Sequence, residues 1–181
     1  MIRFATEAYS DETRIIAANY LLRTKEIDLA ENKFQLLQAL FKEENPNVRM
    51  GLSAAVAKTG SSEIIEPFID YLKKEGDYRV VINAVRNFGS FKYIDIIDKV
   101  LAFLEHSNEQ VASAAAGYLQ KNGQLSDTRF YLESLPKMKN ESAKLSLQSA
   151  VLGLYDQYYP RSRKKIIADL ENAYSLSLIH I

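Results

Sequence analysis

Residues 45–60 read NPNVRMGLSAAVAKTG, a stretch that holds the start, the body and the end of one helix. Pro46 cannot continue a preceding helix and favours a new start. Small and aliphatic residues follow, and Gly60 suits a helix end, where a left-handed residue costs glycine little. We therefore expect a helix whose small side chains let a neighbouring helix approach closely.

The same pattern occurs at four other places in the chain. Aligned on Arg49, the matching positions are spaced 31 to 35 residues apart and are Arg14, Val81, Ala112 and Lys144. Seven residues after each position stands an apolar residue. Three residues after it stands a small or aliphatic one, including Ala17, Ala84 and Ala115. Offsets of three and seven share one helix face, so the pattern predicts five amphipathic helices with a partly small-residue stripe.

Start and stop signals divide the chain in the same way. The expected N-caps are Asp11, Asn47, Asp77, Asn108 and Asn140. The expected helix ends, as left-handed residues, are Gly60, Gly89 and Gly123. A second helical pattern follows each of these helices, and its expected apolar sides include Phe34, Leu37, Leu40 and Phe41 in one unit and Ile94, Ile97 and Val100 in another.

Five helix pairs cannot each bury an apolar face alone, whereas stacked pairs can. We therefore predict an all-α fold, an α-solenoid of about five antiparallel helix pairs. Its units are expected at residues 10–44, 45–76, 77–107, 108–139 and 140–174. Residues 1–9 are expected to end a preceding helix or repeat. No segment shows the sustained period-two alternation of a strand.

The stretch VRMGLSAAVAKTG, followed by EIIEPFIDYLKK, resembles a HEAT repeat of the short form found in bacterial HEAT and lyase-type repeat proteins. The resemblance covers about residues 11–174 and implies a right-handed solenoid whose second helices line a concave surface. Pro67 matches the early proline of the family's second helix. Arg14 and Arg49 match its arginine, which the resemblance implies to be structural, bridging to acidic groups of the adjoining unit. Val81 and Ala112 depart from that arginine pattern.

A narrower resemblance concerns residues 3–25, RFATEAYSDETRIIAANYLLRTK, and the units that follow. They are similar to the helical segment of bacterial proteins that join HEAT repeats to cyclophilin-type peptidyl-prolyl isomerase domains. None of the isomerase's own residues has a counterpart in this chain.

Composition narrows the classes of function. Of 181 residues, 47% are hydrophobic and 25% charged, an ordinary globular mixture. Basic and acidic residues number 23 each, which disfavours a general polyanion binder. The absence of cysteine excludes thiolate zinc sites and a cysteine nucleophile. No apolar run approaches the roughly 20 residues that span a bilayer, and MIRFATEAY lacks the apolar core of a signal peptide.

The last six residues, LSLIHI, match the translation of a transposase adaptor used in sequencing libraries. We expect residues 175–181 to be such a tail, with the natural protein continuing past about Tyr174. The alternative is a natural apolar start to another helix.

The candidate partner-binding residues are acidic and lie in second-helix segments. Glu66 and Asp70 share the polar side of one such segment, and Asp95 and Asp98 share that of the next. We expect an acidic strip that attracts a basic or polar segment, and a solvated helix face is the alternative. Carboxylate pairs also act as general acid and base, but that role needs a pocket and shifted pKa values.

Three other patterns have a functional and a structural interpretation. A basic cluster could contact phosphates, or could be ordinary surface; it comprises Arg161, Arg163, Lys164 and Lys165. A tyrosine group could bind a partner, or could seal a repeat boundary; it comprises Tyr155, Tyr158 and Tyr159. His106 follows a helix end, where a cation interacts favourably with helix carbonyls, and it has no paired metal ligand.

These observations favour a non-catalytic scaffold, with no cofactor or metal, that holds a protein or peptide partner or a covalently attached domain. One alternative is the helical portion of a cyclophilin-type peptidyl-prolyl isomerase whose catalytic domain lies outside this chain. The other is a HEAT-like nucleic-acid-binding protein, which the zero net charge disfavours. The compartment stays open: cytoplasmic by default, and periplasm or cell envelope on the isomerase alternative.

Overall fold

Asparagine and aspartate side chains set the start of four helices. In the computed structural model, which describes residues 1–158 and 163–178, the side-chain oxygens of these residues accept main-chain N–H groups two or three residues onward, at 2.6 to 3.0 Å. The capping residues are Asn45, Asp77, Asn108 and Asn140. The helices that follow them are α4 (Pro46–Lys58), α6 (Tyr78–Asn87), α8 (Glu109–Asn122) and α10 (Glu141–Tyr158).

Two of the predicted caps were wrong by one or two residues. Asp11 is the first residue of α2 (Asp11–Arg23), after the N-cap Ser10, and Asn47 lies inside α4. The second error has a plain cause, because proline prefers the first position of a helix. Pro46 takes that position and leaves Asn45 as the cap.

The part of the chain that the structure describes is helical and contains no strand, which confirms the predicted all-α class. The remaining α-helices are α1 (Ile2–Glu7), α3 (Lys33–Lys42), α5 (Ile65–Leu72), α7 (Tyr93–Phe103), α9 (Thr128–Ser134) and α11 (Arg163–Leu178). Short 3-10 turns are η1 (Ala30–Asn32), η2 (Ser62–Ile64), η3 (Phe88–Ser90), η4 (Leu125–Asp127) and η5 (Leu135–Lys137). None of the helices within the described ranges combines the length and the apolar character needed to cross a membrane.

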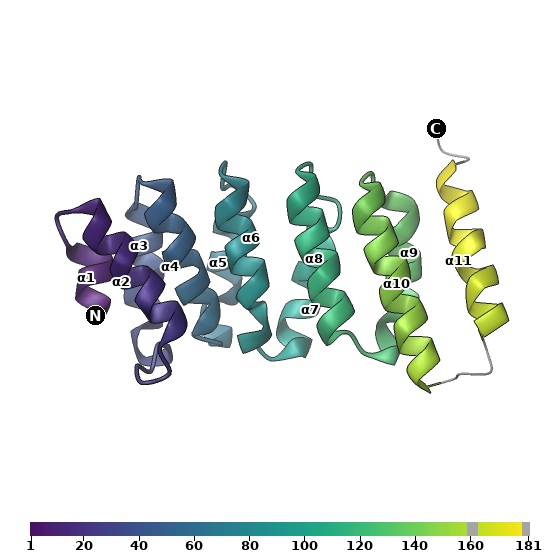
Figure 1. Ribbon diagram of the computed structural model, residues 1–181, viewed down its shortest axis with the longest axis horizontal. Coiled ribbons are helices and arrows are strands. Elements are labelled where there is room, and N and C mark those ends of the chain that lie inside the picture. Colours follow the sequence, from purple (N-terminus) through teal and green to yellow (C-terminus); the bar gives the residue numbers. More distant parts are fainter. Residues whose placement is uncertain (159–162, 179–181) are drawn as a thin grey trace. The chain divides into compact units, whose positions relative to one another are not determined.

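The chain divides within α7 into two compact units, Met1–Ile97 and Asp98–Ile181. In the first unit α4 packs against α2 on one side and α6 on the other, and α3 also contacts α4 (Figure 1). Small residues allow this close packing: a Cβ added to Gly51 would lie 2.7 Å from Cβ of Ala18. Ala17 and Ala84 are buried as well.

In the second unit α8 and α10 lie side by side (Figure 1). Ala115 is buried in α8. Helix α9 contacts α10, and α11 contacts η5, α10 and α9. The tail expected at 175–181 is described only as far as Leu178, the last residue of α11, and residues 179–181 lie outside the described ranges.

The three glycines expected to end helices differ in their places: Gly60 and Gly123 follow α4 and α8, whereas Gly89 lies inside the 3-10 turn η3. Gly60 has a φ of 65°, and an added Cβ would collide with the carbonyl oxygen of Ser90, so this position requires glycine. The left-handed conformation expected at Gly89 and Gly123 was wrong, because among the described residues Gly60 alone has a positive φ. Gly123 is extended, with a φ of −63°, and its missing side chain leaves room for the hydroxyl of Tyr131.

The expected apolar side of two second helices was also partly wrong. Phe34 and Phe41 of α3 are 55% and 46% exposed, and Ile94 of α7 is 77% exposed. The buried side of α3 consists of Leu36, Leu37 and Leu40. Phe41 instead stacks on Tyr71 of α5, with ring centroids 5.2 Å apart.

The ammonium group of Lys58 in α4 caps the end of α2. Its Nζ donates hydrogen bonds to the main-chain oxygens of Leu21, Leu22 and Thr24, at 3.1, 2.8 and 2.7 Å. Carbonyls at a helix end have no partner within the helix, and a cation there is favoured by the helix dipole. One side chain therefore joins two neighbouring helices.

We expect Lys58→Met, which keeps the aliphatic stem, to lower the free energy of unfolding by about 1–3 kcal/mol. Lys121→Met is the matched control, since Lys121 lies thirteen residues after its N-cap, as Lys58 does, and is exposed. The measurement is urea unfolding followed by circular dichroism. Equal stability of the two variants would contradict the capping role.

Candidate functional site

Arg14 and Arg49 make equivalent two-pronged ion pairs near the starts of α2 and α4. Nε and Nη2 of Arg14 donate to the Glu43 carboxylate at 2.9 and 3.2 Å, and those of Arg49 donate to Glu75 at 2.9 and 3.1 Å. Each glutamate lies in the same predicted unit as its arginine, and not in the adjoining one. The link to the preceding unit is made by Nη1, which donates to the main-chain oxygen of Ala8 or Glu44 at 2.7 and 2.6 Å.

Glu75 is the most heavily bonded carboxylate of this arrangement. Besides Arg49, it accepts the hydroxyl of Tyr71 at 2.7 Å and the N–H of Asp77 at 2.9 Å, and its side chain is only 5% exposed. Burial by itself would raise the pKa of Glu75, but the hydrogen bonds from Asp77, Tyr71 and Arg49 lower it below the ordinary 4.5. Burial and the bond to Glu75 raise the pKa of Tyr71. Glu75 is therefore a structural anion.

This pairing predicts a pH-dependent part of the stability. Because the folded-state pKa of Glu75 is depressed, its contribution is complete above the unfolded value of about 4.5 and is lost as the pH falls below it. We expect Glu75→Gln to lower the free energy of unfolding by about 2 kcal/mol at pH 7, with a smaller loss at pH 3.5.

Urea unfolding between pH 3.5 and 7 checks this expectation. Glu31→Gln serves as the control, because Glu31 is an exposed glutamate of the same compact unit, Met1–Ile97. A loss that stays constant across this pH range would show that ionisation of Glu75 is not its source.

The four acidic residues expected to bind a partner are all exposed. Glu66 and Asp70 lie on α5, and Asp95 and Asp98 lie on α7. Lys73 lies 3.7 Å from Asp70 and moderates the local charge. Pro67 sits in the first turn of α5, where a missing N–H costs nothing. Each acidic pair is thus presented on its own helix.

The other sequence patterns are only partly described. Lys164 and Lys165 are exposed in α11, whereas Arg161 and Tyr159 lie outside the described residues, as do the side chains of Arg163 and Tyr158. Nδ1 of His106 accepts the N–H of Asn108 at 3.0 Å, a contact that the sequence did not predict. It therefore supports the cap of α8.

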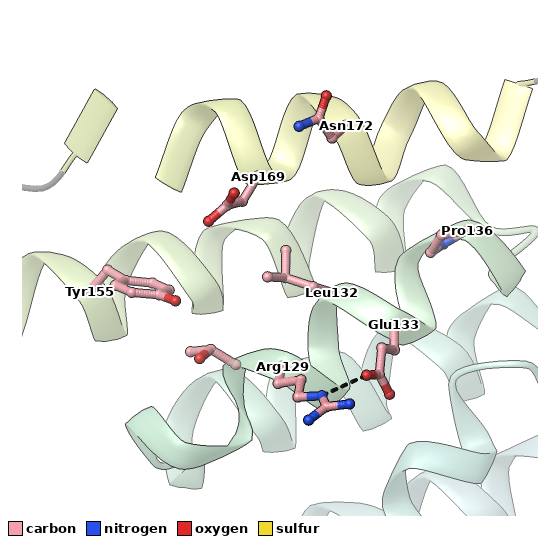
Figure 2. A pocket seen from close by; sticks show the side chains of 8 residues that line it. Arg129, Leu132, Glu133, Pro136, Tyr155, Asp169 and Asn172 are labelled. Carbon is pink, nitrogen blue, oxygen red and sulfur yellow. Dashed lines mark hydrogen bonds and ion pairs between the residues drawn. The ribbon is translucent and has the colours of Figure 1, made fainter. Parts of the chain in front are cut away.

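A cleft of about 420 Å³ lies between α9 and α11, and sequence reasoning did not find it (Figure 2). Helix α9 ends at Ser134 because Pro136 disfavours a continuing α-helix, and the chain turns into η5. The longer α11 rests on η5 and α10, so it passes over α9 without filling the space. Leu132 and Pro136 form an apolar part of the lining, and Tyr155 of α10 adds an aromatic ring.

The polar groups of the cleft stand on opposite walls. Asp169 of α11 points toward α9, and Arg129 and Glu133 lie on α9 (Figure 2). Nε of Arg129 donates to Oε1 of Glu133 at 2.8 Å, and both side chains are more than half exposed. Two carboxylates against one guanidinium leave a net negative charge. Of these lining residues, the sequence singled out only Tyr155; the rest depend on how α11 docks.

Neither a protein-family model nor a curated protein matches this chain. Within residues 1–158 and 163–178, no group of three or more histidine, cysteine, aspartate or glutamate residues is arranged to hold a metal ion. The site is therefore interpreted from its own geometry, as an acidic and partly apolar surface.

Proposed function

We propose that this chain is a HEAT-like scaffold, a right-handed α-solenoid of five helix pairs, which binds a protein partner or an attached domain through exposed side chains of its second helices. The spacing of the caps supports the repeat. Asn45, Asp77, Asn108 and Asn140 each stand at the first residue of a predicted unit. The equivalent pairs of Arg14 and Arg49 support it further.

The observation that supports the binding role is a difference in exposure between neighbouring helices. Helix α4 buries eight of its residues and leaves little surface for a partner. Helix α5 buries Ile65, Phe68, Ile69 and Leu72 and exposes Glu66 and Asp70 on its other side. Acidic side chains on a rigid, one-sided helix suit recognition of a basic segment, through charge complementarity and several weak contacts.

The solenoid itself is tested by small-angle X-ray scattering. A globular chain of 181 residues has a radius of gyration of about 16 Å. Helix pairs stacked about 10 Å apart give an elongated particle with a radius of gyration of about 19–20 Å. A value of 16 Å in a monomeric sample would exclude the solenoid.

The binding role is tested on an array of 12-residue peptides that differ in charge. We expect retention on peptides rich in lysine or arginine, and a loss of about tenfold when the acidic second-helix residues are neutralised. The test variant combines Glu66→Gln, Asp70→Asn, Asp95→Asn and Asp98→Asn. The control removes the same charge elsewhere through Glu12→Gln, Glu26→Gln, Glu109→Gln and Asp156→Asn. Equal losses in the two variants would reduce the effect to net charge and refute a binding face.

A further inference from the structure

We infer that the cleft between α9 and α11 binds a lysine or arginine side chain of an extended segment from a partner protein. The inference rests on the proposed scaffold function and adds to it a particular anchor site and the chemistry of its ligand. The lining that carries it consists of Leu132, Glu133, Pro136, Tyr155 and Asp169.

The shape and the lining of the cleft fit a long, amphipathic side chain. A volume of about 420 Å³ lies within the range of ordinary ligand pockets. Lysine and arginine lay their methylene stems on apolar surface while the charged head stays at a polar rim. Leu132 and Pro136 supply such a surface, and the ring of Tyr155 adds an aromatic wall of the kind that attracts cations.

The net negative charge of the cleft favours a positively charged ligand. Asp169 is half-buried and points toward α9, and no hydrogen bond or ion pair joins its carboxylate to another described residue (Figure 2). On the opposite wall, Glu133 shares its charge with Arg129, which is 83% exposed. A cation entering the cleft meets an uncompensated carboxylate next to apolar surface, where less water surrounds the pair than on an open face.

The same features disfavour other ligands. A phosphate or an acidic peptide would be repelled by Asp169 and Glu133. A divalent metal ion requires more oxygen ligands than these two carboxylates provide. A small polyamine shares the cationic chemistry, but the cleft is open to solvent and runs between two helices, which suits a chain that extends past the anchor.

The test measures binding of a labelled 12-residue peptide, with three lysines spaced by glycine and serine, to the full chain. Fluorescence anisotropy gives the Kd, and methyl NMR locates the site through Leu132, with the buried Leu52 of α4 in the first unit as a reference. We expect Asp169→Asn to weaken binding about fivefold. The matched control, Asp156→Asn, removes the same charge from an exposed position on α10 and should change the Kd less than twofold. Circular dichroism establishes that both variants fold.

A second variant, Tyr155→Leu, keeps apolar bulk and should weaken binding about threefold by removing the aromatic face. A peptide with norleucine in place of lysine should bind at least tenfold more weakly than the lysine peptide. Equal binding of the norleucine peptide would overturn the cationic assignment. Spermidine that binds as tightly as the peptide would overturn the protein segment as occupant.

The proposed function and this inference fail in distinguishable ways. If the lysine peptide binds but Asp169→Asn and Asp156→Asn behave alike, and Leu132 does not shift, the cleft is not the anchor while the acidic second-helix surface stays tenable. If no basic peptide is retained either in solution or on the array, both proposals fall.

Discussion

A glutamate carboxylate at the end of one helical segment fixes the positions of three segments at once. Glu75 follows α5, accepts the N–H of Asp77 where α6 is about to begin, and holds the guanidinium of Arg49 in α4. That guanidinium in turn donates to the main-chain oxygen of Glu44, ahead of α4. Burying a charge is costly unless every lone pair finds a donor. The hydrogen bonds at Glu75 meet that condition, and Glu43 repeats the arrangement one unit earlier with Arg14 and Asn45.

The arginine and the glutamate of this arrangement are replaced together elsewhere in the sequence. In the third and fourth predicted units, Val81 and Ala112 stand at the positions equivalent to Arg14 and Arg49. His106 and Met138 stand at the positions equivalent to Glu43 and Glu75. A buried arginine without its carboxylate, or the reverse, would leave an uncompensated charge. His106 keeps half of the glutamate's role, because its Nδ1 still accepts the N–H of the next cap residue, Asn108. Both members of the ion pair are therefore absent at these positions, and the capping residues keep the same spacing.

The buried residues of α4 were easier to predict from the sequence than those of α3, for a physical reason. Helix α4 lies against α2, α3 and α6, so almost all of its apolar and small residues are buried. Its sequence pattern therefore fits a single assignment of core positions. Helix α3 is buried on one side only, and its apolar residues nearly encircle it. Periodicity therefore grouped Phe34 and Phe41 with the core, whereas the leucines between them form it. Three of the five caps were predicted correctly because cap chemistry is local; Pro46 shifted one cap by two residues, and Ser10 takes the place expected for Asp11.

The cleft between α9 and α11 was beyond sequence reasoning because it depends on a turn and a docking contact and not on a motif. An ion pair at a half-exposed carboxylate contributes about 1 kcal/mol or less, so a single anchor binds weakly. The field of a charged group is screened within about 10 Å, so the negative charge of the cleft acts locally even though the whole chain is neutral.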